Sequence, residues 1–188
     1  EMETVLKLSN NIFSRLSGNG IDLGGGVGSV SSVVSLSELV DSIIVLEITR
    51  NCVIKCYPIV ISKILGNRRS KVSSVIGDFD NLNLEAKSLD FAIALDAMHH
   101  SNDIVKTLKE VRRVLKEDGY FLIIDRGRNN ATSQEEVDRM LNVQYSEEFL
   151  MDNYLPKDKI LTRKDNGEHE YRYNEWSEFF SLSGFVIE

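Results

Sequence analysis

Residues 21–28 read Ile-Asp-Leu-Gly-Gly-Gly-Val-Gly, and this stretch decides how the rest of the chain is interpreted. A short apolar run leads into a turn that contains Gly24, Gly25, Gly26 and Gly28. Glycine has no Cβ, so the backbone of such a turn can approach a ligand closely. A buried strand followed by a glycine-rich turn and a helix is typical of open α/β folds, which bind ligands at the carboxyl ends of their strands.

Short apolar runs recur along the chain, separated by longer amphipathic segments. We expect strands at residues 21–23, 43–46, 72–76, 89–95 and 120–124, and helices at 28–40, 51–65 and 103–116. Pro58 should kink the second helix or start a new one. Strands separated by helices imply parallel pairing through right-handed crossovers. The sequence therefore predicts an α/β fold with a doubly wound, mostly parallel open sheet and helices on both faces.

Two of these helices carry specific expectations. Residues 28–40 are rich in Ser and Val, which are poor helix formers, but a parallel crossover requires a helix there. Its apolar face would hold Val30, Val33, Leu36 and Val40. The helix at 103–116 would bury Ile104, Leu108, Val111 and Leu115, with Ser101 or Asn102 as its cap.

The composition excludes several classes of protein. The chain has 188 residues, with 22 Lys and Arg against 29 Asp and Glu, a net charge of −7. This balance argues against nucleic acid or an anionic membrane surface as the main partner. No window approaches the about 18 apolar residues of a membrane span, and residues 1–3 do not begin a signal peptide. Cys52 and Cys56, without a nearby histidine, predict packed thiols of a cytoplasmic protein and no metal site.

Three more motifs follow the glycine turn at ordered intervals. Glu47 ends the second expected strand, and Gly77-Asp78-Phe79 follows the third. Residues 89–100 read Leu-Asp-Phe-Ala-Ile-Ala-Leu-Asp-Ala-Met-His-His, and residues 108–120 read Leu-Lys-Glu-Val-Arg-Arg-Val-Leu-Lys-Glu-Asp-Gly-Tyr. Together with residues 21–28, these motifs closely resemble the class I S-adenosylmethionine-dependent methyltransferases of the small-molecule type. The resemblance covers about residues 18–126, although Asp118-Gly119 replaces the family's usual glycine pair.

The resemblance implies a Rossmann-like methyltransferase fold, with a C-terminal hairpin that we expect to be incomplete here, and S-adenosyl-L-methionine as cofactor. Asp22 would help to place the amino-acid portion of the cofactor, along which Gly24, Gly26 and Gly28 would pack. Glu47 would accept hydrogen bonds from the ribose hydroxyls, and Asp78 from the adenine amine, with Phe79 beside the ring. Gly25, Asp96 and Ala97 complete the expected cofactor-binding residues.

Two alternatives remain beside this interpretation. An NAD-dependent oxidoreductase would carry the fingerprint G-x-G-x-x-G, which needs glycine at the position of Ser29. Dinucleotide enzymes also do not usually carry the Gly77-Asp78 pair. The other alternative is a non-catalytic cofactor-binding or scaffolding module of the same fold, suggested by the short segment before the first strand.

Methyl transfer from a sulfonium is an in-line displacement, which positioning of the two reactants can accelerate strongly. A base is needed only for a nucleophile that arrives protonated. His99 and His100 follow the fourth strand, and an imidazole with a pKa of about 6.5 can accept a proton near neutral pH. We expect one of them to act as the base, or both to line the pocket. Asp96-Ala97-Met98-His99 lacks the prolines found here in DNA and protein-glutamine amino methyltransferases, which favours a small-molecule acceptor over nucleic acid.

We expect residues 1–188 to form a single domain: a cofactor-binding α/β core at 18–126, a substrate-cover insertion at 127–175, and the last helix with the start of a final strand at 176–188. Within the insertion, Ser133 and Glu136 form a capping box that predicts a helix of fifteen residues or more. An apolar acceptor site, or ordinary packing against the sheet, would use Tyr145, Phe149, Tyr154, Tyr171, Tyr173 and Trp176. Residues 134–178 hold 12 acids and 6 bases, so six of the seven net negative charges lie there, on a solvated surface or beside the acceptor.

Overall fold

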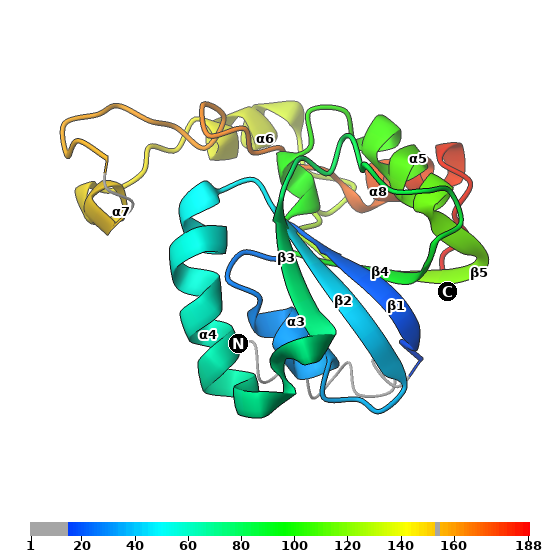
Figure 1. The fold of residues 1–188 in the computed structure, drawn as a ribbon. Coiled ribbons are helices and arrows are strands. Elements are labelled where there is room, and N and C mark those ends of the chain that lie inside the picture. Colours follow the sequence, from blue (N-terminus) through cyan, green and yellow to red (C-terminus); the bar gives the residue numbers. More distant parts are fainter. Residues whose placement is uncertain (1–14, 153–154) are drawn as a thin grey trace.

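The computed structural model describes residues 15–152 and 155–188, which form a five-stranded, wholly parallel sheet (Figure 1). The strands are β1 (Gly18–Leu23), β2 (Val40–Glu47), β3 (Val72–Ile76), β4 (Leu89–Leu95) and β5 (Leu115–Ile124). They lie in the order β3-β2-β1-β4-β5, so the chain winds outward from β1 in both directions. The predicted open, doubly wound α/β sheet is confirmed.

Helices cover both faces of this sheet (Figure 1). The helical elements are α3 (Ser29–Val34), η1 (Cys52–Cys56), α4 (Tyr57–Leu65), η2 (Gly66–Lys71), η3 (Met98–His100), α5 (Ile104–Val114), α6 (Gln134–Leu141), α7 (Glu147–Asp152) and α8 (Tyr173–Leu182). The apolar side chains of α3 and α4 pack on one face, and those of α5 and α8 on the other. A segment that includes α7 projects away from the sheet, at the upper left of Figure 1.

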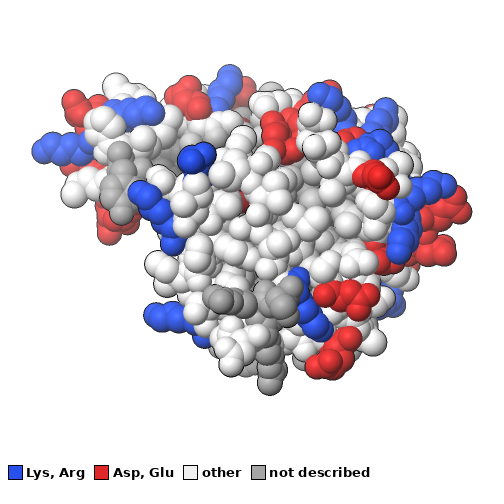
Figure 2. Space-filling view, viewed as in Figure 1, with Lys and Arg blue, Asp and Glu red and all other residues white. Residues whose placement is uncertain are grey.

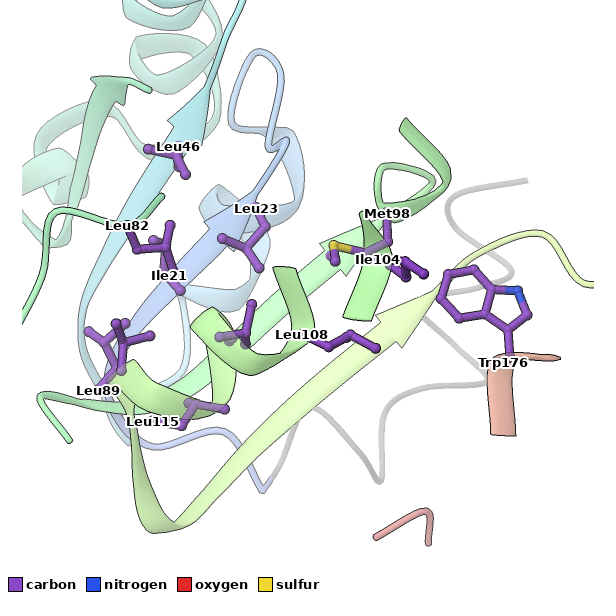
Figure 3. Packing of buried hydrophobic residues seen from close by; sticks show 14 residues of the cluster. Ile21, Leu23, Leu46, Leu82, Leu89, Met98, Ile104, Leu108, Leu115 and Trp176 are labelled. Atoms are coloured by element: carbon purple, nitrogen blue, oxygen red, sulfur yellow. The ribbon is translucent and has the colours of Figure 1, made fainter. Parts of the chain in front are cut away.

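The larger core lies between the sheet and α5 (Figure 3). Ile21 and Leu23 reach it from alternate positions of β1, and Leu108 reaches it from α5 with none of its surface exposed. Trp176 closes the cluster from α8. Because successive strand residues point to opposite faces, Asp22 points away from this core toward α3. Full burial of a leucine such as Leu108 contributes about 1.5–3 kcal/mol to folding.

The helix after the glycine turn exists, but its predicted face and end are wrong. Helix α3 stops at Val34, and Val40 already belongs to β2. Val33 and Leu36 are exposed, whereas Ser31 and Ser32 are fully buried. The physical reason is that the serine hydroxyls are satisfied: the hydroxyl of Ser31 donates to Asp22 Oδ2 at 2.6 Å and that of Ser32 to the Gly28 carbonyl at 2.6 Å. A hydrogen-bonded serine can face the sheet where only apolar side chains were expected.

Two further expectations need correction. The helix cap before α5 is Asp103, whose carboxylate accepts from the Lys106 N–H at 3.0 Å, instead of Ser101 or Asn102. Leu115 lies in β5, because the backbone becomes extended directly after Val114. By contrast, α4 begins at Tyr57, with Pro58 in its first turn, as the sequence predicts.

Near the C-terminus, two more predictions are wrong. Ser133 caps α6 and accepts from the Glu136 N–H at 3.1 Å, but the helix ends at Leu141, where the side chain of Asn142 donates to the Asp138 carbonyl. Residues 185–187 form no strand. The chain turns at Gly184 (φ 77°), and Phe185 packs on Phe121 with ring centroids 5.7 Å apart.

Tyr154 and residues 1–14 lie outside the described residues. Within the described part of the chain, no helix combines the length and the apolar character that a bilayer span requires.

Candidate functional site

The glycine turn at residues 24–28 is built from left-handed backbone. Gly24, Gly26 and Gly28 have φ values of 65°, 56° and 79°, which other residues adopt only with strain. A Cβ on Gly24 would lie 2.6 Å from the Cβ of Ala97, so the turns after β1 and β4 touch at this point. A Cβ on Gly26 would meet no described atom within 4 Å. The turn is therefore packed on one side and open on the other.

Glu47 joins this turn to the end of β2. The Gly26 N–H donates to Glu47 Oε2 at 3.0 Å, and the Thr49 N–H donates to Oε1 at 2.7 Å. Glu47 is only 9% exposed. An ionised carboxylate has about four acceptor positions, so each oxygen can accept one further hydrogen bond. The Glu47 carbonyl also accepts from the Gly77 N–H at 3.1 Å, which connects the acid to the turn after β3.

Asp22 lies beneath the turn and is 1% exposed. Its Oδ2 accepts from the Ser31 hydroxyl, and a Cβ on Gly25 would come within 2.7 Å of its Cγ. The pKa of Asp22 is raised to about 7, chiefly because the carboxyl group is buried. Hydrogen bonds from Ser31 lower this pKa, and the nearby charge of Glu47 raises it. Asp22 therefore holds the turn against α3 from behind.

The third motif approaches the same turn. The Phe79 ring lies 3.9 Å from the position of a Cβ on Gly24, and it packs against the core. Asp78 Oδ1 accepts from the Asp80 N–H at 2.8 Å. The structure thus brings the segments after β1, β2, β3 and β4 together at one end of the sheet.

Asp96 directly follows β4 and has a left-handed conformation, with φ of 50°. Its side chain is 58% exposed and pairs with Arg126, whose Nε lies 2.9 Å from Asp96 Oδ1. Ala97 is buried against Gly24. Of these two expected cofactor-binding residues, Ala97 touches the glycine turn and Asp96 faces the end of β5.

The two histidines after β4 have different surroundings. His99 is 1% exposed, and its Nδ1 lies 2.7 Å from Oδ1 of Asp125, the residue directly after β5. His100 is half-buried, and its ring packs against that of His99 at a centroid distance of 4.3 Å, with the two rings tilted by 40°. Burial lowers the pKa of His100, and the neighbouring His99 lowers it further.

An ion-pair network that the sequence analysis missed anchors residues 163–170 at the end of β5. Arg126 Nη1 lies 2.6 Å from Glu168, Arg128 Nε lies 2.5 Å from Glu170, and Arg163 Nη2 contacts both glutamates at 2.7 Å and 2.5 Å. The Tyr145 hydroxyl donates to Glu168. The sequence holds a signal for this network, because Arg126 and Arg128 are two residues apart, as are Glu168 and Glu170. Their separation of 42 residues concealed it.

The electrostatic effect of this network is large. Burial alone would raise the pKa of Glu168, but hydrogen bonds from Tyr145, Arg163 and Arg126 outweigh burial and lower it to about 2. Part of the acidity of residues 134–178 is therefore neutralised inside the molecule instead of facing solvent.

Several of the expected aromatic residues have packing roles. Tyr171 and Trp176 meet edge to face at 5.3 Å and contact the core, and Trp176 Nε1 donates to the Arg126 carbonyl at 2.8 Å. Tyr145 stacks on Phe149 at 4.0 Å. Tyr173 is largely exposed.

The two cysteines are unpaired, Cys52 half-buried and Cys56 exposed. Asp96, His99 and Asp125 place oxygen and nitrogen atoms within 4.8 Å of one another. The Asp96 and Asp125 oxygens already pair with Arg126 and His99, so a cation would have to displace both interactions.

Comparison with known proteins agrees with this geometry. The family model described as "Methyltransferase domain" matches residues 21–123. The curated protein "Uncharacterized methyltransferase YcgJ" of Bacillus subtilis (strain 168) is 30% identical over 105 residues, which are 56% of this chain and 39% of that protein. The matched region is therefore about two-fifths of the length of that relative.

Solved structures share the fold. The crystal structure of YcgJ superposes with a TM-score of 0.69 at 23% identity, covering 96% of this chain and 68% of that one. A SAM-dependent methyltransferase from Leishmania major gives a TM-score of 0.67 at 14% identity, covering 99% and 64%. From the family match and the arrangement of the four motifs, the chain belongs to the methyltransferase-domain family of class I S-adenosylmethionine-dependent methyltransferases.

Proposed function

We propose that this chain binds S-adenosyl-L-methionine at the carboxyl ends of β1 to β4 and transfers its methyl group in line to a small-molecule acceptor in the cytoplasm. The observation that carries the proposal is the hydrogen bond of 3.0 Å from the Gly26 N–H to Glu47, at a glycine where an added Cβ would meet no described atom within 4 Å. A turn of this shape admits a ligand close to the backbone, and the adjoining acid can hold it.

The residues present fit the cofactor. Glu47 keeps one acceptor position on each oxygen after its two backbone bonds, which suits a ribose diol. Phe79 lies beside Gly24, in reach of a ring bound along the turn, and Asp78 precedes it as acceptor for an exocyclic amine. When bound, the cofactor supplies an activated methyl group. The protein's part is to orient the two reactants and exclude water.

Charge supports a small-molecule acceptor over nucleic acid. Arg126, Arg128 and Arg163 are engaged with Glu168 and Glu170, so these guanidinium groups are occupied. On the described part of the face drawn in Figure 2, Lys and Arg are scattered among Asp and Glu and form no continuous basic surface. Binding of a nucleic-acid backbone normally needs such a surface.

The interpretation of residues 127–175 as a cover for the acceptor is part of the proposal. Residues 163–170 reach the ends of β4 and β5 through the Arg126–Glu168 pair and through the His169 N–H, which donates to the His99 carbonyl at 2.9 Å. Their contacts with the ends of β4 and β5 support the proposal that this segment covers the acceptor. In the same proposal, residues 18–126 hold the cofactor.

Isothermal titration of the full chain with S-adenosylhomocysteine tests cofactor binding. We expect saturable binding that Glu47→Gln weakens by tenfold or more, because an amide offers one acceptor oxygen where the carboxylate offers two. The matched control is Glu117→Gln, an exposed change at the opposite end of the sheet, which should leave the affinity unchanged. Absence of binding by the folded chain refutes the proposal.

A turnover assay distinguishes a methyltransferase from a non-catalytic binding module. The chain is incubated with S-adenosylmethionine and panels of phenols, amines, thiols and carbon acids, and release of S-adenosylhomocysteine is measured. Turnover of any acceptor supports the enzyme. Cofactor binding without turnover of any acceptor would favour the non-catalytic module.

A further inference from the structure

One buried polar atom lacks a role in the fold. Among the described residues, Nε2 of His99 is buried and has no hydrogen-bond partner. The whole side chain is 1% exposed. Buried polar atoms are nearly always paired, and leaving one unpaired costs stability, so each exception in a folded protein needs an explanation.

The other ring nitrogen of His99 is held firmly. Asp125 Oδ1 lies 2.7 Å from His99 Nδ1, and Oδ2 accepts from the backbone N–H groups of Met98 at 2.8 Å and His99 at 3.2 Å. Burial alone would raise the pKa of Asp125, but the hydrogen bonds from His99 and the backbone outweigh it and keep the pKa below its ordinary value. An ionised carboxylate can only accept hydrogen bonds, so Nδ1 carries a proton, and in the neutral ring Nε2 then has the free lone pair.

The pair lies where methyl transfer would occur. His99 is two residues after Ala97, which contacts Gly24 of the glycine turn. Asp125 is the first residue after β5, the strand next to β4. A structural role for Asp125, which holds the turn η3 in place, accounts for both of its oxygens but not for the unpaired Nε2.

We propose that Asp125 is a positioning residue that fixes His99 in the Nδ1–H tautomer, so that Nε2 acts as the general base toward a protonated methyl acceptor. This inference rests on the proposed function. In the step, the acceptor's oxygen, nitrogen or other nucleophilic atom forms a bond to the methyl carbon. The bond from that carbon to sulfur breaks and leaves its electron pair on sulfur. The acceptor's proton passes to His99 Nε2, and the resulting imidazolium is stabilised by Asp125.

His100 is the less suitable base. Its ring is not held by a carboxylate in the described contacts, and it packs against the His99 ring instead. This assigns the proton-accepting role, which the sequence left open between the two histidines, to His99.

Other charged and titratable groups lie around His99. Asp96 Oδ1 lies 3.8 Å from His99 Nδ1, and Arg126 pairs with Asp96 and Glu168 nearby. His169 contacts the His99 carbonyl through its N–H and through Nδ1 at 3.0 Å. Because Nε2 is fully covered, an acceptor must displace part of its covering to reach it.

Nitrogen-15 NMR of the imidazole rings tests the assignment directly. The chain has only three histidines, so the variants His100→Gln and His169→Gln assign the signals. In the wild-type chain saturated with S-adenosylhomocysteine near neutral pH, we expect His99 Nδ1 to be protonated and Nε2 to have the shift of an unprotonated nitrogen. An Nε2–H tautomer, or an imidazolium throughout the neutral range, overturns the proposal. Binding of S-adenosylhomocysteine in the same sample shows that such a failure is distinct from failure of the proposed function.

A kinetic arm separates positioning from a purely structural role. With a protonated acceptor from the turnover panel, Asp125→Asn and His99→Gln should each lower kcat by about 10²- to 10⁴-fold. The KM for S-adenosylmethionine should change less than twofold, and the acid limb of the pH–rate profile should disappear in His99→Gln. Asp125→Asn should also shift the His99 tautomer in the spectrum. Unchanged kcat in both folded variants would refute the proposal.

Discussion

The Gly26 N–H donates to Glu47 Oε2 at 3.0 Å, and this hydrogen bond joins the turn after β1 to the acid that ends β2. The two residues are 21 positions apart in the sequence. Parallel pairing of β1 and β2 brings their carboxyl ends to the same edge, with Leu23 opposite Leu46. The bond therefore fixes the shape of the turn and the direction of the carboxylate together.

The contact between Gly24 and Ala97 predicts that two glycine variants lower the free energy of unfolding by different amounts. Gly24→Ala and Gly26→Ala both introduce left-handed strain of about 1–2 kcal/mol. Gly24→Ala also places a methyl group 2.6 Å from the Ala97 Cβ, whereas Gly26→Ala meets no described atom. Chemical denaturation should therefore show the larger loss of stability for Gly24→Ala.

The second half of this prediction is a rescue. Ala97→Gly removes the clashing Cβ, so Gly24→Ala should cost less in that background than in the wild type, with a coupling energy of about 1 kcal/mol or more. Additive effects in the double variant would contradict the contact. For Gly26→Ala, the expected loss is in affinity for S-adenosylhomocysteine, because its methyl group points into the open space before the turn.

Asp22 predicts a pH-dependent stability difference. Its pKa is about 7 in the folded chain, against 3.8 for the free carboxyl group, so the folded state keeps a proton that the unfolded state loses between these values. The contribution of Asp22 to stability therefore falls as the pH rises from about 4 to about 7 and is constant above that. Asp22→Asn lacks this dependence.

Urea denaturation at several pH values measures the effect. The stability of Asp22→Asn relative to the wild type should rise across that window, by a total on the order of 4 kcal/mol. The comparison with the wild type cancels the titration of other groups, such as Glu168. A difference that stays constant from pH 4 to 8 would show that Asp22 ionises normally in the folded chain.

The sequence predicts the architecture well where local signals act. The runs predicted for β3 and β4 match the observed strands residue for residue. For β4 the reason is that a buried parallel strand is read directly as a continuous apolar segment. The four motifs also meet at one edge, as expected. The face of α3 could not be predicted, because Ser31 is buried by its hydrogen bond to Asp22, a partner outside the helix.

Long-range polar partners limit the prediction of the site. Both histidines after β4 are visible in the sequence, but the separation of 26 residues between His99 and Asp125 hides their contact. The same applies to Arg126 and Glu168. Charged residues are common on solvated surfaces, so without the strand order nothing indicates which of them are buried and paired.

The ion-pair network around Glu168 predicts that replacing Arg163 strongly lowers the free energy of unfolding. Arg163→Ala removes the guanidinium that contacts Glu168 and Glu170, whose side chains are 5% and 0% exposed. Removing one partner of a buried ion pair costs about 3–5 kcal/mol. The matched control is Arg139→Ala, which breaks an exposed pair with Glu136 and should lower the free energy of unfolding far less than Arg163→Ala does. Equal losses in denaturation would contradict the buried network.

The same network predicts sensitivity to acid. The pKa of Glu168 is about 2 against 4.5 for the free group, so its stabilising contribution is fully present above about pH 4.5 and is lost as the pH falls toward 2. Glu168→Gln should therefore be less stable than the wild type near neutral pH. The difference in the free energy of unfolding between the two proteins should shrink as the pH falls from about 4.5 to about 2. A difference that does not change with pH would show that Glu168 is not held ionised in the folded chain.

The central claim is that this chain is an S-adenosylmethionine-binding methyltransferase, and calorimetric comparison of two ligands tests it most directly. Asp78, after β3, is the proposed acceptor for the adenine amine, and dinucleotide enzymes do not usually carry the Gly77-Asp78 pair. We expect the full chain to bind S-adenosylhomocysteine more tightly than NADH, and Asp78→Ala to weaken the binding of S-adenosylhomocysteine by tenfold or more. Tighter binding of NADH, or no binding of S-adenosylhomocysteine by the folded chain, would contradict the central claim.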